Sequence, residues 1–268
     1  MSKQRAWIFT LGTEVVRGIV VNTNAAFLGK KLSQLGFTVE GAVSLIDDKE
    51  LVAKFLKYVV SEYEPELVVT TGGLGPTYDD ITLEVVAKAL SKPLVLNSEA
   101  LEMLKEKLAS KGYELTKERV KMAYMPEGAS PIPNTVGTAP GALIRYGSTT
   151  IVCLPGVPRE MEEMWLYVEN MIRGSIEVFM AEGSFVSVGV PEAMLAPVLK
   201  KLYETYSSSY IKSHPRGYEL SNPVVEIYVS VTSNSNASAR ALVREICSKI
   251  VEDVVKLGGS IRDFRCSP

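Results

Sequence analysis

The sequence predicts an α/β protein, with a three-layer α/β/α domain on a mostly parallel sheet followed by a small α+β domain. Strand-like and helix-like segments alternate from the N-terminus onward. The strand candidate ELVVTT, residues 66–71, is apolar throughout, as in a parallel sheet covered on both faces. After about Glu177 the pattern changes, and VEIYVSVT alternates as a strand with one solvated face does. We therefore expect two domains, residues 1–174 and 175–268.

The first domain begins with repeated strand–helix units. The helix candidate NTNAAFLGKKLSQLG can be capped by Asn22 or Thr23, repeats leucines at helical spacing and ends at Gly36. The other units follow from the same periodicities: strands are expected at residues 5–11, 37–46 and 66–71, and helices at residues 47–63 and 81–90.

Helices, a long loop and a hairpin complete this domain. The segment MPEGASPIPNTVGTAPG is rich in proline and glycine, and its length indicates a functional loop. A hairpin turns at Gly147, and helices are expected at residues 98–112, 116–123 and 157–172. In the second domain, strands are expected at residues 184–190, 210–213 and 224–231, and helices at residues 193–206 and 237–258.

The composition argues against several classes of protein. A net charge of −2 does not favour a nucleic-acid binder with a strong basic face. His214 is the only histidine, which disfavours multi-histidine zinc sites. Cys153, Cys247 and Cys266 are odd in number and form no CxxC pair, so neither a metal finger nor a disulfide framework is expected. Cys153 lies in TTIVCLPG and is expected in a buried strand. A catalytic role is not expected for it, because no histidine is near it in sequence to activate the thiol.

The cellular location is inferred from the lack of a membrane-spanning segment and of a signal peptide in the sequence. No apolar run approaches the roughly 20 residues needed to span a bilayer. The N-terminal residues lack the apolar core of a signal peptide. We expect a cytoplasmic protein.

The segment TTGGLGPTYDDIT, residues 70–82, carries the strongest chemical signal. Gly72, Gly73 and Gly75 allow a sharp turn and close approach to a ligand before a helix whose N-terminus attracts anions. Asp79 and Asp80 would repel a phosphate unless a divalent cation lay between them. The same residues also allow a simple turn and a capping box from Thr77 to Asp80, and the segment is neither a Walker loop nor GxGxxG. Both interpretations stay open at this point.

Four motifs together resemble one family. The glycine segment, GTEVVRGIVVNTNAAFLGKKLSQLG, KMAYMPEGASPIPNTVGTAPG and CLPGVPREMEEMW occur in the order found in CinA-like proteins. Their first domain belongs to the molybdopterin-binding superfamily with MogA, MoaB, MoeA and gephyrin, so the resemblance implies a MogA/MoaB-like fold. Through SVGVPEAML and YIKSHPRGYEL, the second domain resembles the KH-like domain of the same proteins, although the family's Gly-x-Gly-Glu is here Gly189-Val-Pro-Glu192.

The resemblance also implies roles for individual residues. Asp80, Thr82 and Glu84 match a shared D-x-T-x-E pattern, and Asp47 matches a second acidic position facing the same pocket. The implied catalytic residues are Asp80, Asp47, Glu84 and Glu14, and the implied metal ligands are Asp79, Asp80 and Asp47. The implied ligand-binding residues are Gly72, Gly73, Gly75, Thr82, Asn22, Asn24, Asn134, Gly137, Thr138, Gly141, Pro155, Gly156 and Glu160. Asn134 and Gly137 fit turn positions equally well.

The activity implied by the resemblance is metal-dependent hydrolysis of ADP-ribose to AMP and ribose 5-phosphate. A divalent Mg, Mn or Co ion would bridge the phosphates, and Glu84 or Glu14 would orient the water. Lys121 either adds positive charge or belongs to a solvated helix face. Many CinA proteins carry a further C-terminal deamidase domain, which is not expected in a sequence that ends at Pro268.

Two other functions compete. A molybdenum-cofactor protein would bind a pterin or nucleotide in the same crevice without hydrolysis, and the D-x-T-x-E pattern does not separate the two. An RNA-binding module is suggested by the second domain, but PRGYEL offers one glycine where a GXXG loop is needed. We therefore expect a small-molecule ligand rather than a nucleic acid or membrane partner. Homo-oligomerisation stays open.

Overall fold

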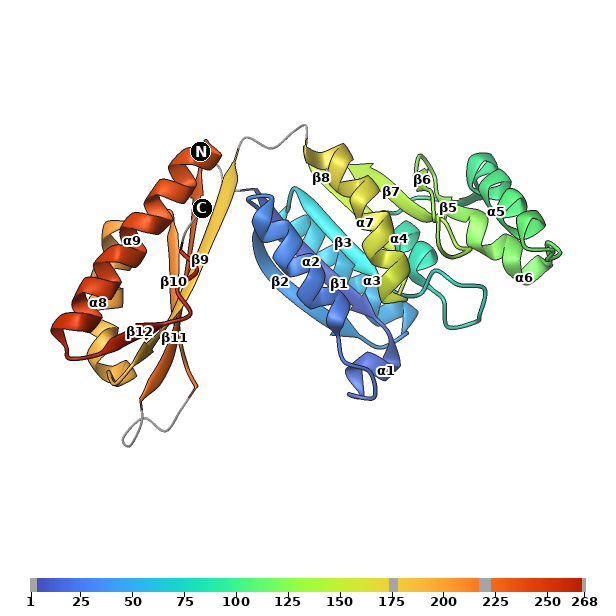
Figure 1. Ribbon diagram of the computed structural model, residues 1–268. Coiled ribbons are helices and arrows are strands. Elements are labelled where there is room, and N and C mark those ends of the chain that lie inside the picture. The colour runs from blue at the N-terminus through green and yellow to red at the C-terminus, as the bar shows by residue number, and fades with distance from the viewer. Residues whose placement is uncertain (1–3, 174–177, 217–222, 267–268) are drawn as a thin grey trace. The chain divides into compact units, whose positions relative to one another are not determined.

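The computed structural model describes residues 4–173, 178–216 and 223–266 (Figure 1). The chain separates into two compact units: Met1–Ser33 with Phe37–Ser175, and Gln34–Gly36 with Ile176–Pro268. The predicted boundary between residues 174 and 175 lies outside the described residues, as does most of the PRGYEL segment.

A six-stranded sheet organises the first unit. Its strand order is β2-β1-β3-β8-β7-β6. The first four strands are parallel, and β7 and β6 add an antiparallel edge. The strands are β1 Arg5–Leu11, β2 Thr38–Leu45, β3 Leu67–Thr71, β6 Ser130–Ile132, β7 Gly141–Tyr146 and β8 Thr149–Leu154. The predicted mostly parallel sheet and the hairpin around Gly147 are confirmed.

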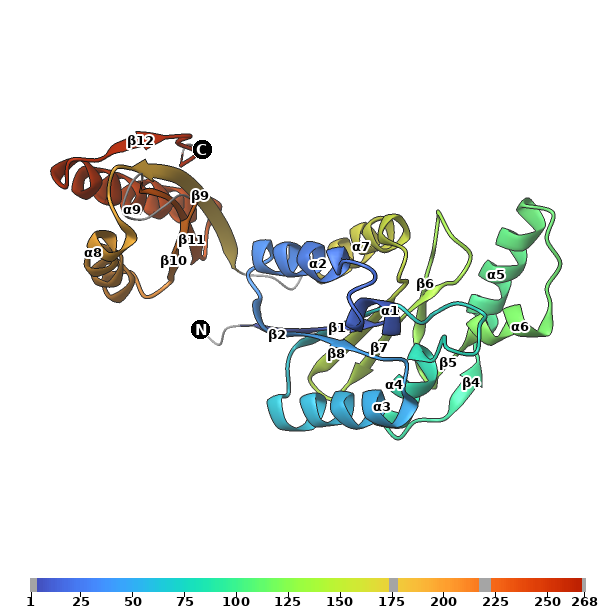
Figure 2. The same cartoon turned by 90° about the horizontal axis from the view of Figure 1, so that it is seen from below.

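Helices cover both faces of this sheet (Figure 2). Helices α2 (Thr23–Gln34) and α7 (Pro158–Arg173) lie on one face, and α3 (Lys49–Tyr58) and α4 (Thr82–Ala89) lie on the other. All five residues of β3 are buried, which explains why its sequence does not alternate. The predicted three-layer α/β/α arrangement is confirmed.

A smaller substructure extends from the sheet. It contains α5 (Ser98–Ser110), α6 (Lys117–Val120) and a two-stranded sheet of β4 (Leu94–Leu96) and β5 (Tyr124–Pro126). Figure 1 shows α5 and α6 beyond the edge of the main sheet. The short sheet was not predicted, because three-residue strands carry too little periodicity to be recognised. Three short helical segments complete this unit: α1 Thr13–Val16, η1 Val59–Tyr63 and η2 Lys121–Ala123.

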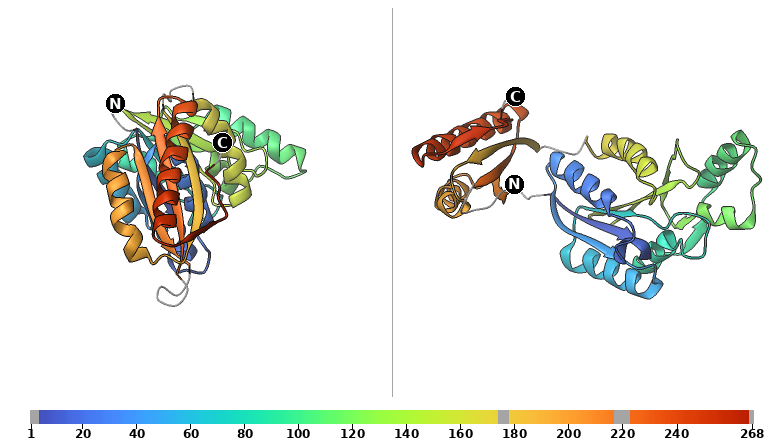
Figure 3. Two further views of the ribbon diagram at one scale, coloured as in Figure 1. Left: turned by 60° about the vertical axis from the view of Figure 1, so that its left-hand side comes forward. Right: turned by 60° about the horizontal axis from the view of Figure 1, so that its bottom comes forward.

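The second unit is an antiparallel sheet with two helices (Figure 3). The sheet has the order β10-β11-β9-β12. Side chains on β9 are buried at every second position, because α8 and α9 pack on one face of the sheet. The elements are β9 Phe179–Val188, α8 Glu192–Thr205, β10 Ser209–Pro215, β11 Val224–Ser233, α9 Asn236–Lys256 and β12 Ser260–Arg262. The predicted α+β class is confirmed, with β12 as an added strand.

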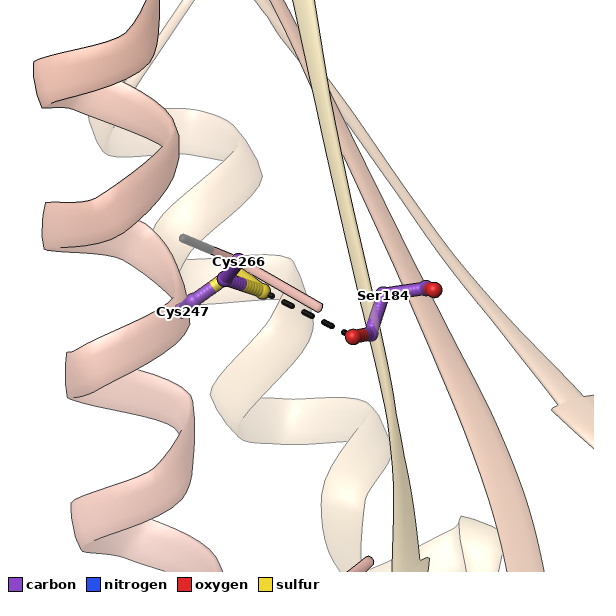
Figure 4. Close-up of a disulfide and its surroundings, with 3 residues drawn as sticks. All are labelled: Ser184, Cys247 and Cys266. Carbon is purple, nitrogen blue, oxygen red and sulfur yellow. Dashed lines mark hydrogen bonds between the residues drawn. A yellow bond between two sulfur atoms is a disulfide. The ribbon is translucent and has the colours of Figure 1, made fainter. Parts of the chain in front are cut away.

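A disulfide joins Cys247 of α9 to Cys266 (Figure 4). The odd cysteine count led us to expect no disulfide framework, and this cross-link corrects that expectation. The two cysteines meet beside Gly183, where a Cβ atom would lie only 2.7 Å from Cys266 Sγ. The space for the bridge therefore depends on contacts between distant segments, which the spacing of cysteines does not reveal.

Cys153 lies in β8 and is fully buried, as predicted. Burial raises the pKa of its thiol to about 12, so the reactive thiolate is scarce at neutral pH. We expect no thiol of the native, oxidised protein to react with Ellman's reagent at pH 8, and one thiol per chain to react after denaturation. Rapid reaction of one equivalent in the native state would contradict this burial.

Among the described helices, none has the length and apolar character needed to cross a membrane.

Candidate ligand-binding site

A pocket of the first unit opens where four parallel strands end. Strand β1 lies between β2 and β3 in the sheet. The chain leaves β1 toward α2 on one face and leaves β3 toward α4 on the opposite face (Figure 2). Such a divergence opens a crevice at the carboxyl ends of the strands. The pocket there has a volume of about 660 Å³, within the usual range of small-molecule sites.

Residues from the ends of β1, β2, β3 and β8 and from the α5–α6 region line this pocket. Most of the predicted catalytic and glycine-loop residues are among them. The sequence-predicted residues on the lining are Glu14, Asp47, Gly72, Gly73, Gly75, Asp79, Asp80, Thr138, Pro155, Gly156 and Glu160.

The glycine loop forms the floor next to β3. Gly72 has φ +107°, and its N–H donates to the carbonyl of Leu154 at 3.0 Å. A Cβ atom on Gly72 would lie 2.1 Å from the carbonyl oxygen of Leu11, so this position needs glycine for both conformation and space. The loop thus brings its backbone directly between the ends of β1 and β8.

Thr82 fixes the loop from below. Its hydroxyl donates to the carbonyl of Gly72 at 2.7 Å, and its N–H donates to the carbonyl of Gly73 at 3.0 Å. Thr82 is fully buried and does not line the pocket. The threonine of the D-x-T-x-E pattern therefore positions the glycine loop from beneath it.

Asp79 and Asp80 converge on Thr77. The Thr77 N–H donates to Asp80 Oδ2 at 2.8 Å, and the Thr77 hydroxyl lies within hydrogen-bond distance of both carboxylates. This hydroxyl is the main reason that the pKa of Asp79 is lowered. Helix α4 starts at Thr82, so Thr77 does not cap it and the capping-box interpretation is wrong. The structure instead holds two neighbouring carboxylates on the pocket lining.

Lys121 joins this acidic turn from η2. Its ammonium group donates to the carbonyl of Thr77, and its charge contributes to lowering the pKa of Asp79. The structure therefore favours the interpretation that Lys121 adds positive charge beside Asp79, and not the interpretation that it belongs to a solvated helix face.

Asp47 lies at the end of β2, on another side of the pocket. Its Oδ2 accepts hydrogen bonds from the N–H and the hydroxyl of Thr13, both at 2.8 Å, and so holds the start of α1. Glu14 is the next residue of α1 after Thr13, and it is exposed. Glu84 is not on the lining of this pocket. It lines an adjoining pocket of about 220 Å³, which shares Gly73, Gly75 and Asp80 with the first, and it pairs with Lys49 at 2.7 Å.

The long loop is held by its own hydrogen bonds. Asn134 Oδ1 accepts from Gly137 N at 2.6 Å, while Asn134 Nδ2 donates to Glu160 Oε2 at 2.8 Å and to the Ala139 carbonyl at 3.0 Å. Asn134 and Gly137 thus shape the turn that presents Thr138 to the pocket. Gly141 is buried at the start of β7 and does not line it.

Asn22 and Asn24 brace the crevice from outside its lining. Asn22 caps α2 by accepting from Ala25 N at 3.0 Å. Asn24 is buried and donates to Thr71 Oγ1 at 2.8 Å and to the Gly156 carbonyl at 2.9 Å, which ties the ends of β3 and β8 together. These asparagines therefore hold strand ends in place.

Tyr113 and Arg119 are among the lining residues that sequence reasoning missed. Tyr113 lies between α5 and α6, and Arg119 lies in the four-residue helix α6. No local pattern could have assigned them, because their place on the pocket depends on how this substructure folds back. Arg119 is the only cationic residue on the described lining, which carries five carboxylates.

The metal prediction can be compared with this geometry. Within residues 4–173, 178–216 and 223–266, no three His, Cys, Asp or Glu side chains are grouped to hold a metal ion. Asp47 therefore does not complete a cluster with Asp79 and Asp80. The neighbouring pair fits a cation held by one or two carboxylates together with oxygen atoms of a bound ligand, as is common for Mg²⁺.

Comparisons with known proteins agree with this architecture. Residues 7–173 match the family model described as "Probable molybdopterin binding domain". The chain is 42% identical over 254 residues to Protein PAE0875 of Pyrobaculum aerophilum, covering 94% of each. The crystal structure of "the protein CinA with unknown function" from Thermoplasma acidophilum is 40% identical, with a TM-score of 0.58, and the match covers 63% of this chain and 98% of that one.

A weaker similarity is found to the molybdopterin biosynthesis enzyme MoaB of Thermus thermophilus, at 21% identity and a TM-score of 0.43, covering 63% of this chain and 90% of that one. The family match covers residues 7–173 and therefore every strand end that lines the pocket. The chain therefore belongs to the molybdopterin-binding domain family, and its first unit has the CinA-like form of that fold.

Proposed function

We propose that the first unit binds a small phosphorylated heterocycle, a molybdopterin-type pterin or a nucleotide, in the crevice at the strand ends. The observation that carries this proposal is the glycine loop, whose backbone forms the pocket floor at the point where β1 and β3 diverge. Backbone N–H groups after a strand and before a helix favour phosphate oxygens. Membership in the molybdopterin-binding domain family supports the same class of ligand.

The charges on the lining specify how such a ligand is held. Five carboxylates and one arginine face the pocket. Phosphates placed beside Asp79 and Asp80 would be repelled unless a cation accompanied them. We therefore expect binding to depend on a divalent cation brought in with the phosphates.

Thermal denaturation of the purified full chain tests the proposal. ADP-ribose, AMP and a phosphorylated pterin would each be added with and without Mg²⁺, and adenosine would serve as the ligand without phosphate. A ligand at 100 times its Kd stabilises the folded state by about 2.7 kcal/mol, which corresponds to a shift of roughly 5–10 °C for a unit of this size. No shift with any phosphorylated compound would contradict the proposal.

A second candidate is hydrolysis of a phosphoanhydride bond, with ADP-ribose giving AMP and ribose 5-phosphate. The observation that favours it is the pair of carboxylates at Thr77, next to the glycine loop on the same lining. A divalent ion bound there would supply Lewis acidity toward the phosphates. Asp80 would help to hold the ion, and the glycine-loop backbone would hold the phosphate oxygens.

Release of AMP separates hydrolysis from binding alone. We expect the wild type to release AMP from ADP-ribose with Mg²⁺, Mn²⁺ or Co²⁺ but not with EDTA. Asp80→Asn is expected to lower the rate at least a hundredfold, since transition-state charge stabilisation is commonly worth that much. Glu102→Gln removes an exposed carboxylate of α5 that pairs with Lys105, and it serves as the matched control. Ligand-induced stabilisation without AMP release would leave binding as the function and exclude hydrolysis.

A further inference from the structure

The large pocket has two chemically different ends. The first is polar and contains the glycine loop with Asp79 and Asp80. The second is formed by the α5–α6 region with η2, whose lining residues Leu108 and Met122 belong to a buried hydrophobic cluster. Leu74 of the glycine loop and Ala139 of the long loop belong to the same cluster and also line the pocket. A ligand that fills both ends must itself have an anionic part and an apolar part.

Tyr113 and Arg119 stand at the apolar end. The Arg119 guanidinium carbon lies over the Tyr113 ring, 5.0 Å from its centre, which is a cation–π contact. Arg119 also donates from Nη1 to the carbonyl of Glu114 at 2.5 Å. These two contacts hold both planar groups in place before any ligand is present.

The Tyr113 ring remains available for contact. Its side chain is 58% exposed although it lines the pocket. Leu108 and Met122 line the same pocket and are almost completely buried, and the Tyr113 N–H donates to the carbonyl of Leu108 at 2.9 Å. An aromatic ring on a pocket lining that also carries apolar side chains is the usual environment for a flat heterocycle, because stacking and burial of the ring faces reinforce each other.

We propose that Tyr113 and Arg119 form the ring-binding end of the pocket, with the ligand heterocycle against Tyr113 and its phosphates toward the glycine loop. This inference rests on the proposed binding function and adds an orientation and two specificity-determining residues. Tyr113 supplies the stacking face. Arg119 fixes the tyrosine and offers its remaining N–H groups to acceptor atoms on the ring edge.

Affinities for a pair of ligands test the assignment. ADP carries both a ring and a diphosphate, whereas inorganic pyrophosphate carries no ring. Dissociation constants would be measured by calorimetry in Mg²⁺ for the full-length wild type, Tyr113→Ala, Tyr113→Phe, Arg119→Gln and Tyr146→Ala. Tyr146 is similarly exposed in the same unit but does not line the pocket, so its variant is the matched control.

We expect Tyr113→Ala to weaken ADP binding about tenfold while changing pyrophosphate affinity less than twofold. Arg119→Gln should also raise the dissociation constant for ADP. Tyr113→Phe should keep that constant within about threefold of the wild-type value, since phenylalanine keeps the ring. Equal losses for both ligands, or no loss for ADP, would overturn the assignment. Wild-type protein that binds pyrophosphate but not ADP would overturn it while leaving phosphate binding intact. Failure to bind either ligand would overturn the assignment, and the proposed function would fall with it if the phosphorylated pterin also gave no thermal shift.

Discussion

Replacing Gly72 with alanine is expected to destabilise the first unit by about 3 kcal/mol or more and to abolish ligand-induced stabilisation. The new Cβ atom would lie 2.1 Å from the Leu11 carbonyl oxygen, and φ at this position is +107°. Backbone strain of this kind costs about 1–3 kcal/mol, and the overlap with a fixed carbonyl adds to it. Relief requires the end of β1 to move away from the loop, which deforms the pocket floor.

Urea denaturation of wild type and Gly72→Ala measures this loss, and Gly147→Ala is the matched control. Gly147 also has a positive φ, +57°, but an added Cβ meets nothing within 4 Å. The control therefore carries only the cost of a left-handed backbone conformation, roughly 1–2 kcal/mol. Equal destabilisation by the two variants would show that Leu11 and Gly72 are not in close contact.

Reduction of the disulfide is expected to destabilise the second unit by about 3 kcal/mol. Cys247 and Cys266 are 19 residues apart, and a cross-link closing a loop of that length lowers the entropy of the unfolded chain by roughly this amount. For a unit of this size, the loss corresponds to a drop in Tm of roughly 12–24 °C. Calorimetric scans with and without dithiothreitol measure it.

Two variants control the interpretation. The variant Cys247→Ser should have a lower Tm than the oxidised wild type, and dithiothreitol should not change that Tm. Ser248→Ala, an exposed neighbour on α9, should keep both the high Tm and the response to reductant. A melting curve of the wild type that is the same with and without dithiothreitol would contradict the cross-link.

Local sequence signals were sufficient for the four parallel strands of the first unit and for the helices that cover them. Strand β1 has the bounds expected from its apolar run. Helix α2 begins at Thr23, directly after its capping residue Asn22. The glycine loop and its two aspartates could be recognised because turn chemistry and charge are encoded in neighbouring residues. Alternation of strands and helices then leaves few arrangements, so the crevice at the strand ends follows from topology.

Features that depend on distant contacts were not predictable. Thr82 and Asn24 look like site residues in sequence, yet their hydrogen bonds place them beneath the pocket and not on it. Tyr113 and Arg119 look like surface residues, yet the path of the chain after α5 brings them onto the lining. The bridge between Cys247 and Cys266 depends on the space at Gly183. The KH-like character of the second unit stays a prediction, because no comparison tests it.

The pocket lining is assembled from chain segments between Leu11 and Glu160 that are far apart in sequence. A bound ligand would stabilise the whole first unit, because local unfolding of any one of these segments would remove contacts with the ligand and release it. Amide hydrogen exchange should therefore slow on ligand binding throughout the sheet and its helices, and not only in the glycine loop. For the same reason, neither an N-terminal nor a C-terminal fragment of this unit would retain the ligand, and its release would mark the first partial unfolding of the unit.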